Sequence, residues 1–278
     1  MSTCFDLSSQ GGVAHLVLKR PDAFNSMIRA FWNELPQIVE GLNAEGATRC
    51  LVISSTGKHF SSGMDLAVFT EGEGVAPGAA DRATAAEKFR LDVKRLQRSF
   101  SCLEEARFPV IAAVQGGVIG GAVDMTTACD IRYAAADAFF QIQEINIGMT
   151  ADVGTFPRLA KLMPEGMVRE LAYTGRRFLA EEALRLGLVN AVLPDAAACT
   201  AHALSTAREI ASKPPVAVTG SKVMITYARD HSTADALDYV GVWNASMLSP
   251  EHMMEAMGAR MQKRPASFPD LARLRAEF

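Results

Sequence analysis

Residues 109–125 of this 278-residue chain read PVIAAVQGGVIGGAVDM, an apolar run followed directly by a glycine-rich stretch. The run at 109–115 is nearly continuous in apolar character, as expected of a strand covered on both faces. Glycine lets the backbone turn with positive φ, and a helix-like segment follows the turn. A strand, a turn and a helix in this order indicate an α/β fold.

Comparable strand runs occur elsewhere in the chain, at 13–19, 49–55 and 130–135. Helical patterns lie between them, such as SMIRAFWNELPQIVEGLN and EKFRLDVKRLQRSFSCLEEA. In the second pattern apolar residues recur at helical spacing and predict a core-facing stripe made of Phe89, Val93, Leu96, Phe100 and Leu103. Alternation of strands and helices supports the α/β class.

After residue 195 the sequence shows helix patterns and no convincing strand, so we expect two regions, 1–195 and 196–278. One helical face near the end carries four methionines, Met253, Met254, Met257 and Met261. This face predicts apolar packing, either on the chain's own core or on a neighbouring subunit. Residues 71–86 are rich in glycine and alanine and predict a mobile loop, a candidate active-site lid.

The composition excludes several classes of function. The formal net charge is −3 and no run of Lys or Arg stands out, which argues against a nucleic-acid partner. No stretch approaches 18 apolar residues and no signal peptide is recognisable, so we expect a cytoplasmic protein without a membrane span. The 5 cysteines are spread without a C-x-x-C pair and the 5 histidines show no ligand spacing, so we expect no metal site.

Two glycine-containing turns follow predicted strands, in GKHFSSGMDL (57–66) and in QGGVIGGAVDM (115–125). Successive N–H groups at such turns can point at a negatively charged oxygen. One donor from each turn would make an oxyanion hole, whereas the alternative is that both are tight turns only. Neither stretch matches the dinucleotide, nucleoside triphosphate or serine-hydrolase signatures.

Three carboxylates lie close to these turns in an apolar stretch of sequence: Asp124, Glu144 and Asp152. Each taken singly has a structural interpretation, as a helix-dipole partner, a solvated strand edge or a helix N-cap. Taken together they indicate proton transfer. Burial among apolar groups would raise their pKa values from about 4 toward neutrality, which suits acid–base chemistry.

Several motifs resemble the crotonase (enoyl-CoA hydratase/isomerase) superfamily. These are LKRPDAFNSM, HFSSGMDL, the long stretch from VQGGVIGGAVDM to QEINIGMTADVGTFPRL, LAYTGRRFLAEEALRLGLVNAV and the closing MQKRPASF. They occur in order and with family spacing from about residue 13 to about residue 268.

The resemblance implies a spiral of ββα units at 1–195 that binds acyl-CoA, and a helical region at 196–278 that builds trimers, usually paired into hexamers. Coenzyme A is then part of the substrate, and no separate cofactor is expected. The motifs match the amides of Met64 and Gly121 to the oxyanion hole. They match the substrate-binding positions to Ser62, Gly63, Asp65, Leu66 and Ala122.

The acids resemble those of the Δ3,5-Δ2,4-dienoyl-CoA isomerases. Two positions depart from the pattern: Ala122 replaces the third glycine of the usual triplet, and Asn146 stands where those isomerases tend to carry an acidic residue. This branch implies Glu144 as the base at C2 of a 3,5-dienoyl-CoA and Asp152 as the acid at C6, with Asp124 assisting. Two alternatives are an enoyl-CoA hydratase that uses Asp124 and Glu144, and a non-catalytic acyl-CoA-binding subunit.

Overall fold

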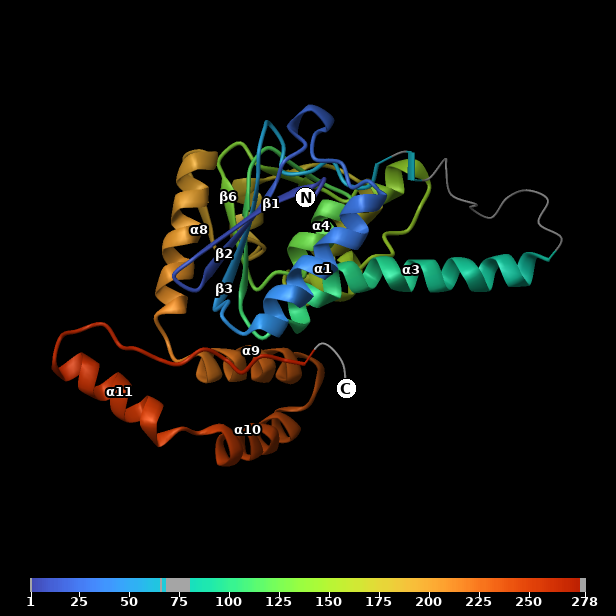
Figure 1. Cartoon of the computed structure of the whole chain (residues 1–278). Helices are drawn as coiled ribbons and strands as arrows, with labels where there is room; N and C mark the ends of the chain where they lie inside the picture. Colours follow the sequence, from blue (N-terminus) through green and yellow to red (C-terminus); the bar gives the residue numbers. More distant parts are fainter. Residues whose placement is uncertain (1, 66, 69–80, 276–278) are drawn as a thin grey trace.

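The computed structural model describes residues 2–65, 67–68 and 81–275 (Figure 1). Its main sheet has six strands in the order β1-β2-β3-β4-β6-β9. The first pair is antiparallel and all other neighbours are parallel. The strands are β1 (Phe5–Gln10), β2 (Val13–Leu18), β3 (Cys50–Ser55), β4 (Val110–Val114), β6 (Ile131–Ala135) and β9 (Ala191–Leu193). The four strand runs predicted from the sequence are thereby confirmed as β2, β3, β4 and β6.

A second sheet of three short strands stands beside the first. It consists of β5 (Gly117–Ile119), β7 (Phe139–Gln141) and β8 (Phe178–Leu179), in that order. β5 follows β4 and β7 follows β6, so each turn of the chain adds one strand to each sheet before a helix begins. This repetition is the ββα spiral that the family resemblance implies, and it brings the glycine stretch of β5 next to the acids after β7.

Helices cover both faces of the main sheet (Figure 1). α8 (Ala196–Ala211) packs on one face, over a cluster that includes Cys50, Val52 and Ile111. The helices on the other face cover Leu51, Ile53 and Val110, the alternating neighbours along the same strands. They are α1 (Arg29–Glu45), α3 (Arg82–Glu105) and α4 (Gly121–Thr127). Apolar residues on both faces explain why the strand runs are apolar throughout.

The predicted core-facing stripe of α3 is right only for the second half of the helix. Phe100 and Leu103 are buried, but Phe89 is 48% exposed. With 24 residues α3 is about 36 Å long, against about 25 Å for the 17 residues of α1 beside it. Its first half therefore projects beyond the sheet (Figure 1). Of the predicted lid loop, residues 71–80 lie outside the described residues, and 82–86 are helical, which corrects that part of the prediction.

Beyond α8 the chain forms α9 (Pro215–Asp230), α10 (Thr233–Met247) and α11 (Pro250–Met261), and the described residues after 195 contain no strand. Lys222 fixes α9 to the core, because its buried ammonium donates hydrogen bonds to the carbonyls of Leu103 and Phe108 and to Asp130. α10 and α11 lie farther from the sheet (Figure 1). The methionine face of α11 is exposed, with Met254 at 65% and Met257 at 61%, so it does not pack on the chain's own core.

Candidate active site

The two glycine turns meet at the junction of the sheets. Ser61 forms a β-bridge with Val118, and its amide donates a hydrogen bond of 3.1 Å to the carbonyl of Gly117. Gly63 has a φ of +82°, and a Cβ built on it would lie 2.5 Å from the carbonyl oxygen of Ile119. Only glycine fits such a backbone conformation in so little space. The contact presses one turn against the other.

The amides of Met64 and Gly121 lie side by side at this contact. A Cβ built on Gly121 would lie 3.7 Å from the nitrogen of Met64, and a Cβ built on Gly63 would lie 3.1 Å from the nitrogen of Gly121. Neither amide donates a hydrogen bond to any described residue. Two unused donors this close together can bind one oxygen atom, as an oxyanion hole requires.

Glu144 lies next to these amides, on η2 (Glu144–Ile147), the single 3₁₀ turn after β7. Its Oε1 is 3.1 Å from the position of a Cβ built on Gly120, and its Oε2 is buried without a hydrogen-bond partner. The carboxylate and both amides line one cavity of about 500 Å³. The predicted base and the predicted oxyanion hole are thus brought together.

Burial raises the pKa of Glu144 to about 7, and the nearby charge of Asp124 adds to this effect. At such a pKa the carboxylate holds and releases a proton near neutral pH, which suits a general base. A buried carboxylate oxygen without a partner is costly in a structure, and such sites call for an explanation. A reacting proton of the substrate would supply the missing partner.

Asp124 is 1% exposed on α4, directly behind the site. Its Oδ1 accepts a hydrogen bond of 2.6 Å from the amide of Thr155 at the start of α5 (Thr155–Leu159). Burial raises its pKa to about 6, although the hydrogen bond from Thr155 opposes the rise. Asp124 therefore ties α4 to α5 and adds negative charge near Glu144. It does not itself line the cavity with the amides.

Asp152, the third predicted acid, does not line the cavity of Glu144 but a different cavity of about 380 Å³. Its carbonyl accepts a hydrogen bond of 2.7 Å from the side chain of Gln97 on α3. Burial raises its pKa, and its charge in turn helps to raise the pKa of Glu144. The expected burial among apolar groups is wrong for Asp152, because its cavity wall includes Glu104, Arg158, Lys161 and Arg229.

Some of the predicted substrate-binding residues line the cavity with the amides, and others do not. Ser62 and Asp65 line the cavity with the amides, and Gly63 shapes its wall. Ser26 donates a hydrogen bond of 2.6 Å to Asp65 and lowers the pKa of that carboxyl. Leu66 lies outside the described residues. Ala122 is fully buried and is not among the residues that line this cavity, so its role in substrate binding stays a prediction.

Two cavity residues were not found from the sequence. Ser26 lies 39 positions from Asp65, and no local pattern connects the two. Arg177 lines the same cavity, and its guanidinium carbon lies 4.4 Å from the centre of the Phe139 ring. Asn146 does not line the cavity, because its amide donates a hydrogen bond to the carbonyl of Gly175 instead.

This arrangement fits one family of enzymes. The family model described as Enoyl-CoA hydratase/isomerase matches residues 8–270, and the chain belongs to this family. The resemblance drawn from the motifs is thereby confirmed. A solved structure of enoyl-CoA hydratase from Bacillus anthracis is similar with a TM-score of 0.84, 28% identity and coverage of 96% of this chain and 99% of that one. The crotonase-like fold is confirmed as well.

Among curated proteins the chain is similar to dienoyl-CoA isomerases. It is 43% identical to the mitochondrial Δ3,5-Δ2,4-dienoyl-CoA isomerase of Mus musculus, over 92% of this chain and 79% of that protein. It is 37% identical to the peroxisomal Δ3,5-Δ2,4-dienoyl-CoA isomerase of Arabidopsis thaliana, over 95% of both. No helix in the described part of the chain is long and apolar enough to cross a membrane.

Proposed function

We propose that this protein is an acyl-CoA double-bond isomerase that converts 3,5-dienoyl-CoA to 2,4-dienoyl-CoA. One observation carries the proposal: the Glu144 carboxylate, with its raised pKa, shares a cavity with the two unused amides of Met64 and Gly121. A base beside an oxyanion hole can remove a proton next to a thioester carbonyl. The similarity to dienoyl-CoA isomerases supports this choice among the reactions of the family.

In the proposed reaction Glu144 removes a proton from C2. The electron pair of the C–H bond forms the C1=C2 double bond of a conjugated enolate, and the π electrons of the carbonyl move to the thioester oxygen, which carries the negative charge between the amides of Met64 and Gly121. When the thioester carbonyl forms again, the double bonds move to C2 and C4, and Asp152 gives a proton to C6. The substrate loses one proton and gains one, and the step needs no water, metal or cofactor other than the coenzyme A of the substrate. The cycle closes when Glu144 releases the proton that it took up and Asp152 regains one.

Asp152 is assigned as the acid because burial raises its pKa, which keeps it protonated at higher pH than an ordinary carboxyl. It is separated from Glu144 by eight positions, and the intervening chain turns through η2 (Glu144–Ile147). Its charge also acts on Glu144 and on Asp124. Two acids that act on opposite ends of a conjugated system must be apart, and the two carboxylates line different cavities.

Asp152→Asn is expected to lower kcat for 3,5-octadienoyl-CoA by roughly 10²–10⁴-fold, because the amide cannot give a proton to C6. Formation of the 2,4-dienoyl product is followed by its ultraviolet absorbance. Asp238→Asn, a change on the exposed side of α10, is the matched control. Near wild-type isomerisation by Asp152→Asn would remove Asp152 from the mechanism.

The two alternatives give different results in the same assay. A hydratase would convert crotonyl-CoA faster than any 3,5-dienoyl-CoA, and it would need Asp124 and Glu144 but not Asp152. A non-catalytic subunit would bind acyl-CoA and turn over neither substrate. The third acid with its raised pKa is the observation that favours isomerisation over both.

The rate is expected to depend on pH in a predictable direction. Glu144 works as a base only when it is ionised, and its pKa is about 7, so kcat/KM should fall as the pH drops below about 7. Asp152 works as an acid only when protonated, so activity should fall again at high pH. A pH–rate profile between pH 5 and 10 measures both limbs. A profile flat down to pH 5 would contradict a base with a raised pKa.

We further propose that the helical region at 196–278 builds an oligomer of three or six chains, through the exposed apolar face of its last helices. Ile225, Leu237, Val242, Met254 and Met257 are all more than 60% exposed, which is unusual for so many large apolar side chains in one region. The expected cytoplasmic location of the protein also stays a prediction.

Light scattering is expected to give a mass three or six times 29.9 kDa. The double variant Met254→Asp, Met257→Asp should lower this mass, because two buried charges destabilise an apolar interface. Glu251→Gln, near the start of the same helix, is the control. A wild-type mass of 29.9 kDa at micromolar concentration would refute the oligomer.

A further inference from the structure

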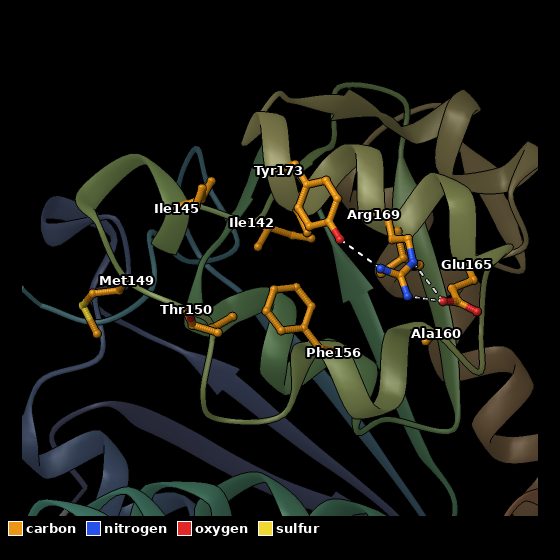
Figure 2. Close-up of a pocket in the computed structure, with 12 residues that line it drawn as sticks. Ile142, Ile145, Met149, Thr150, Phe156, Ala160, Glu165, Arg169 and Tyr173 are labelled. Atoms are coloured by element: carbon orange, nitrogen blue, oxygen red, sulfur yellow. Dashed lines mark hydrogen bonds and ion pairs between the residues drawn. The ribbon is translucent and has the colours of Figure 1, made fainter. Parts of the chain in front are cut away.

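A third cavity is lined in part by Ile142 and Ile145, which flank Glu144 in the chain (Figure 2). It has a volume of about 370 Å³ and lies between residues 142–151 and the helices α5 and α6 (Glu165–Thr174). Ile142, Phe156 and Tyr173 point toward one another in it (Figure 2). The size and the largely apolar lining are typical of a site for a small organic group.

The cavity adjoins both proposed catalytic acids through the chain itself. Ile142 and Ile145 line it and flank Glu144 in the sequence. Ala151 directly precedes Asp152, and it lines both this cavity and the one that Asp152 faces. A ligand that extends past Asp152 therefore meets Ala151, with charged residues on one side and apolar residues on the other.

We propose that this cavity binds the part of the acyl chain beyond C6, a proposal that rests on the function above. In that function C6 lies at Asp152, so any further carbons must leave the site there. The cavity of Asp152 is lined by Glu104, Arg158, Lys161 and Arg229, which offer an alkyl chain little apolar contact. The apolar cavity beyond Ala151 is the favourable path. Each methylene that enters it should tighten binding about fourfold.

The outer rim of the cavity limits the length of the acyl chain that can bind in it. Arg169 donates hydrogen bonds to Glu165 at 2.6 Å and to the Tyr173 hydroxyl at 2.9 Å (Figure 2). A methyl group that reaches this rim gains no further apolar contact, and it would disturb the ion pair. The gain in affinity per methylene is therefore expected to stop at a definite chain length.

The test measures binding of saturated acyl-CoA thioesters, which need no turnover. Calorimetry gives Kd for hexanoyl-, octanoyl-, decanoyl- and dodecanoyl-CoA with the wild type and with Ala172→Phe, which fills the cavity from α6. Ala201→Phe, at an exposed alanine of α8 away from both cavities, is the matched control. Ala160→Phe fills the same cavity from its exposed rim, should Ala172→Phe fail to fold.

The expected result is a wild-type Kd that falls about fourfold per added methylene and then levels off. The ratio of Kd for hexanoyl-CoA to Kd for decanoyl-CoA should collapse toward one in the filled variant and persist in Ala201→Phe. The proposal is overturned by a wild-type affinity independent of chain length, or by a filled variant that keeps the wild-type ratio. Failure of the proposed function shows separately, as a lack of turnover of 3,5-hexadienoyl-CoA, which has no carbon beyond C6.

Discussion

Glu144→Gln is expected to lower kcat for 3,5-dienoyl-CoA by roughly 10²–10⁴-fold, the usual contribution of a general base. The amide has nearly the shape of the acid but cannot take the C2 proton, whereas the amides of Met64 and Gly121 stay in place. KM should change much less than kcat, because the oxyanion hole and the coenzyme A contacts do not involve the missing charge. Steady-state kinetics of the purified variant measures this, with Glu181→Gln on the exposed side of α7 (Ala180–Arg185) as the control.

The same variant is expected to be more stable than the wild type above pH 7. Burial raises the pKa of Glu144 from 4.5 to about 7, so the folded state binds its proton more tightly than the unfolded state does. Ionisation of this carboxyl costs nothing below about pH 4.5 and up to about 3 kcal/mol above pH 7. Glutamine avoids that cost.

Urea unfolding of both proteins at pH 5 and at pH 8 measures the difference. The gain in the free energy of unfolding of Glu144→Gln over the wild type should be small at pH 5 and large at pH 8. A loss of both activity and stability in Glu144→Gln would mean that this side chain holds the fold together and is not kept there for its chemistry. Equal gains at the two pH values would contradict the raised pKa.

Gly121→Ala is expected to lower kcat by roughly 10²–10³-fold, as does removal of an oxyanion-hole donor in other enzymes. The added methyl group would lie 3.7 Å from the Met64 nitrogen, beside the point at which the proposed reaction places the thioester oxygen. Its closest contact is the flexible Met27 side chain, with the sulfur at 3.2 Å, so the chain should still fold.

The control for this variant is Gly41→Ala in α1, where an added Cβ meets no atom within 4 Å. Both purified variants are compared in kinetics and in thermal unfolding. A Gly121→Ala enzyme with wild-type kcat would show that the two amides do not hold the oxygen. A marked drop in unfolding temperature without a drop in kcat would assign Gly121 to packing alone.

The strands of the main sheet could be predicted where burial on both faces made them apolar throughout. β1 (Phe5–Gln10) was missed because only Phe5 in it is buried, and its sequence FDLSSQ carries little apolar signal. β8 was missed because it has two residues. The edges of a sheet are held by backbone hydrogen bonds to a neighbour, and those leave little trace in the local sequence.

The site could be predicted as a set of residues but not as an arrangement. The glycines and the acidic residues could be recognised in the sequence from their residue type, and the resemblance to the family assigned their roles. The contact between the two turns depends on the bridge from Ser61 to Val118, which joins residues 57 positions apart. The side on which Asp152 lies depends on the turn at η2, and no local pattern fixed that direction.

The 3₁₀ turn η2 has one further consequence, for how such proteins diversify. Glu144 and Ile147, three positions apart, lie on one side of this turn, and Ile142 and Ile145 on the other. Substitutions on the second side can reshape the room for an alkyl tail and leave the acid on the first untouched. Insertion of one residue would rotate both sides at once. Relatives should therefore differ freely in the size of these isoleucines, while the length of the segment stays constant.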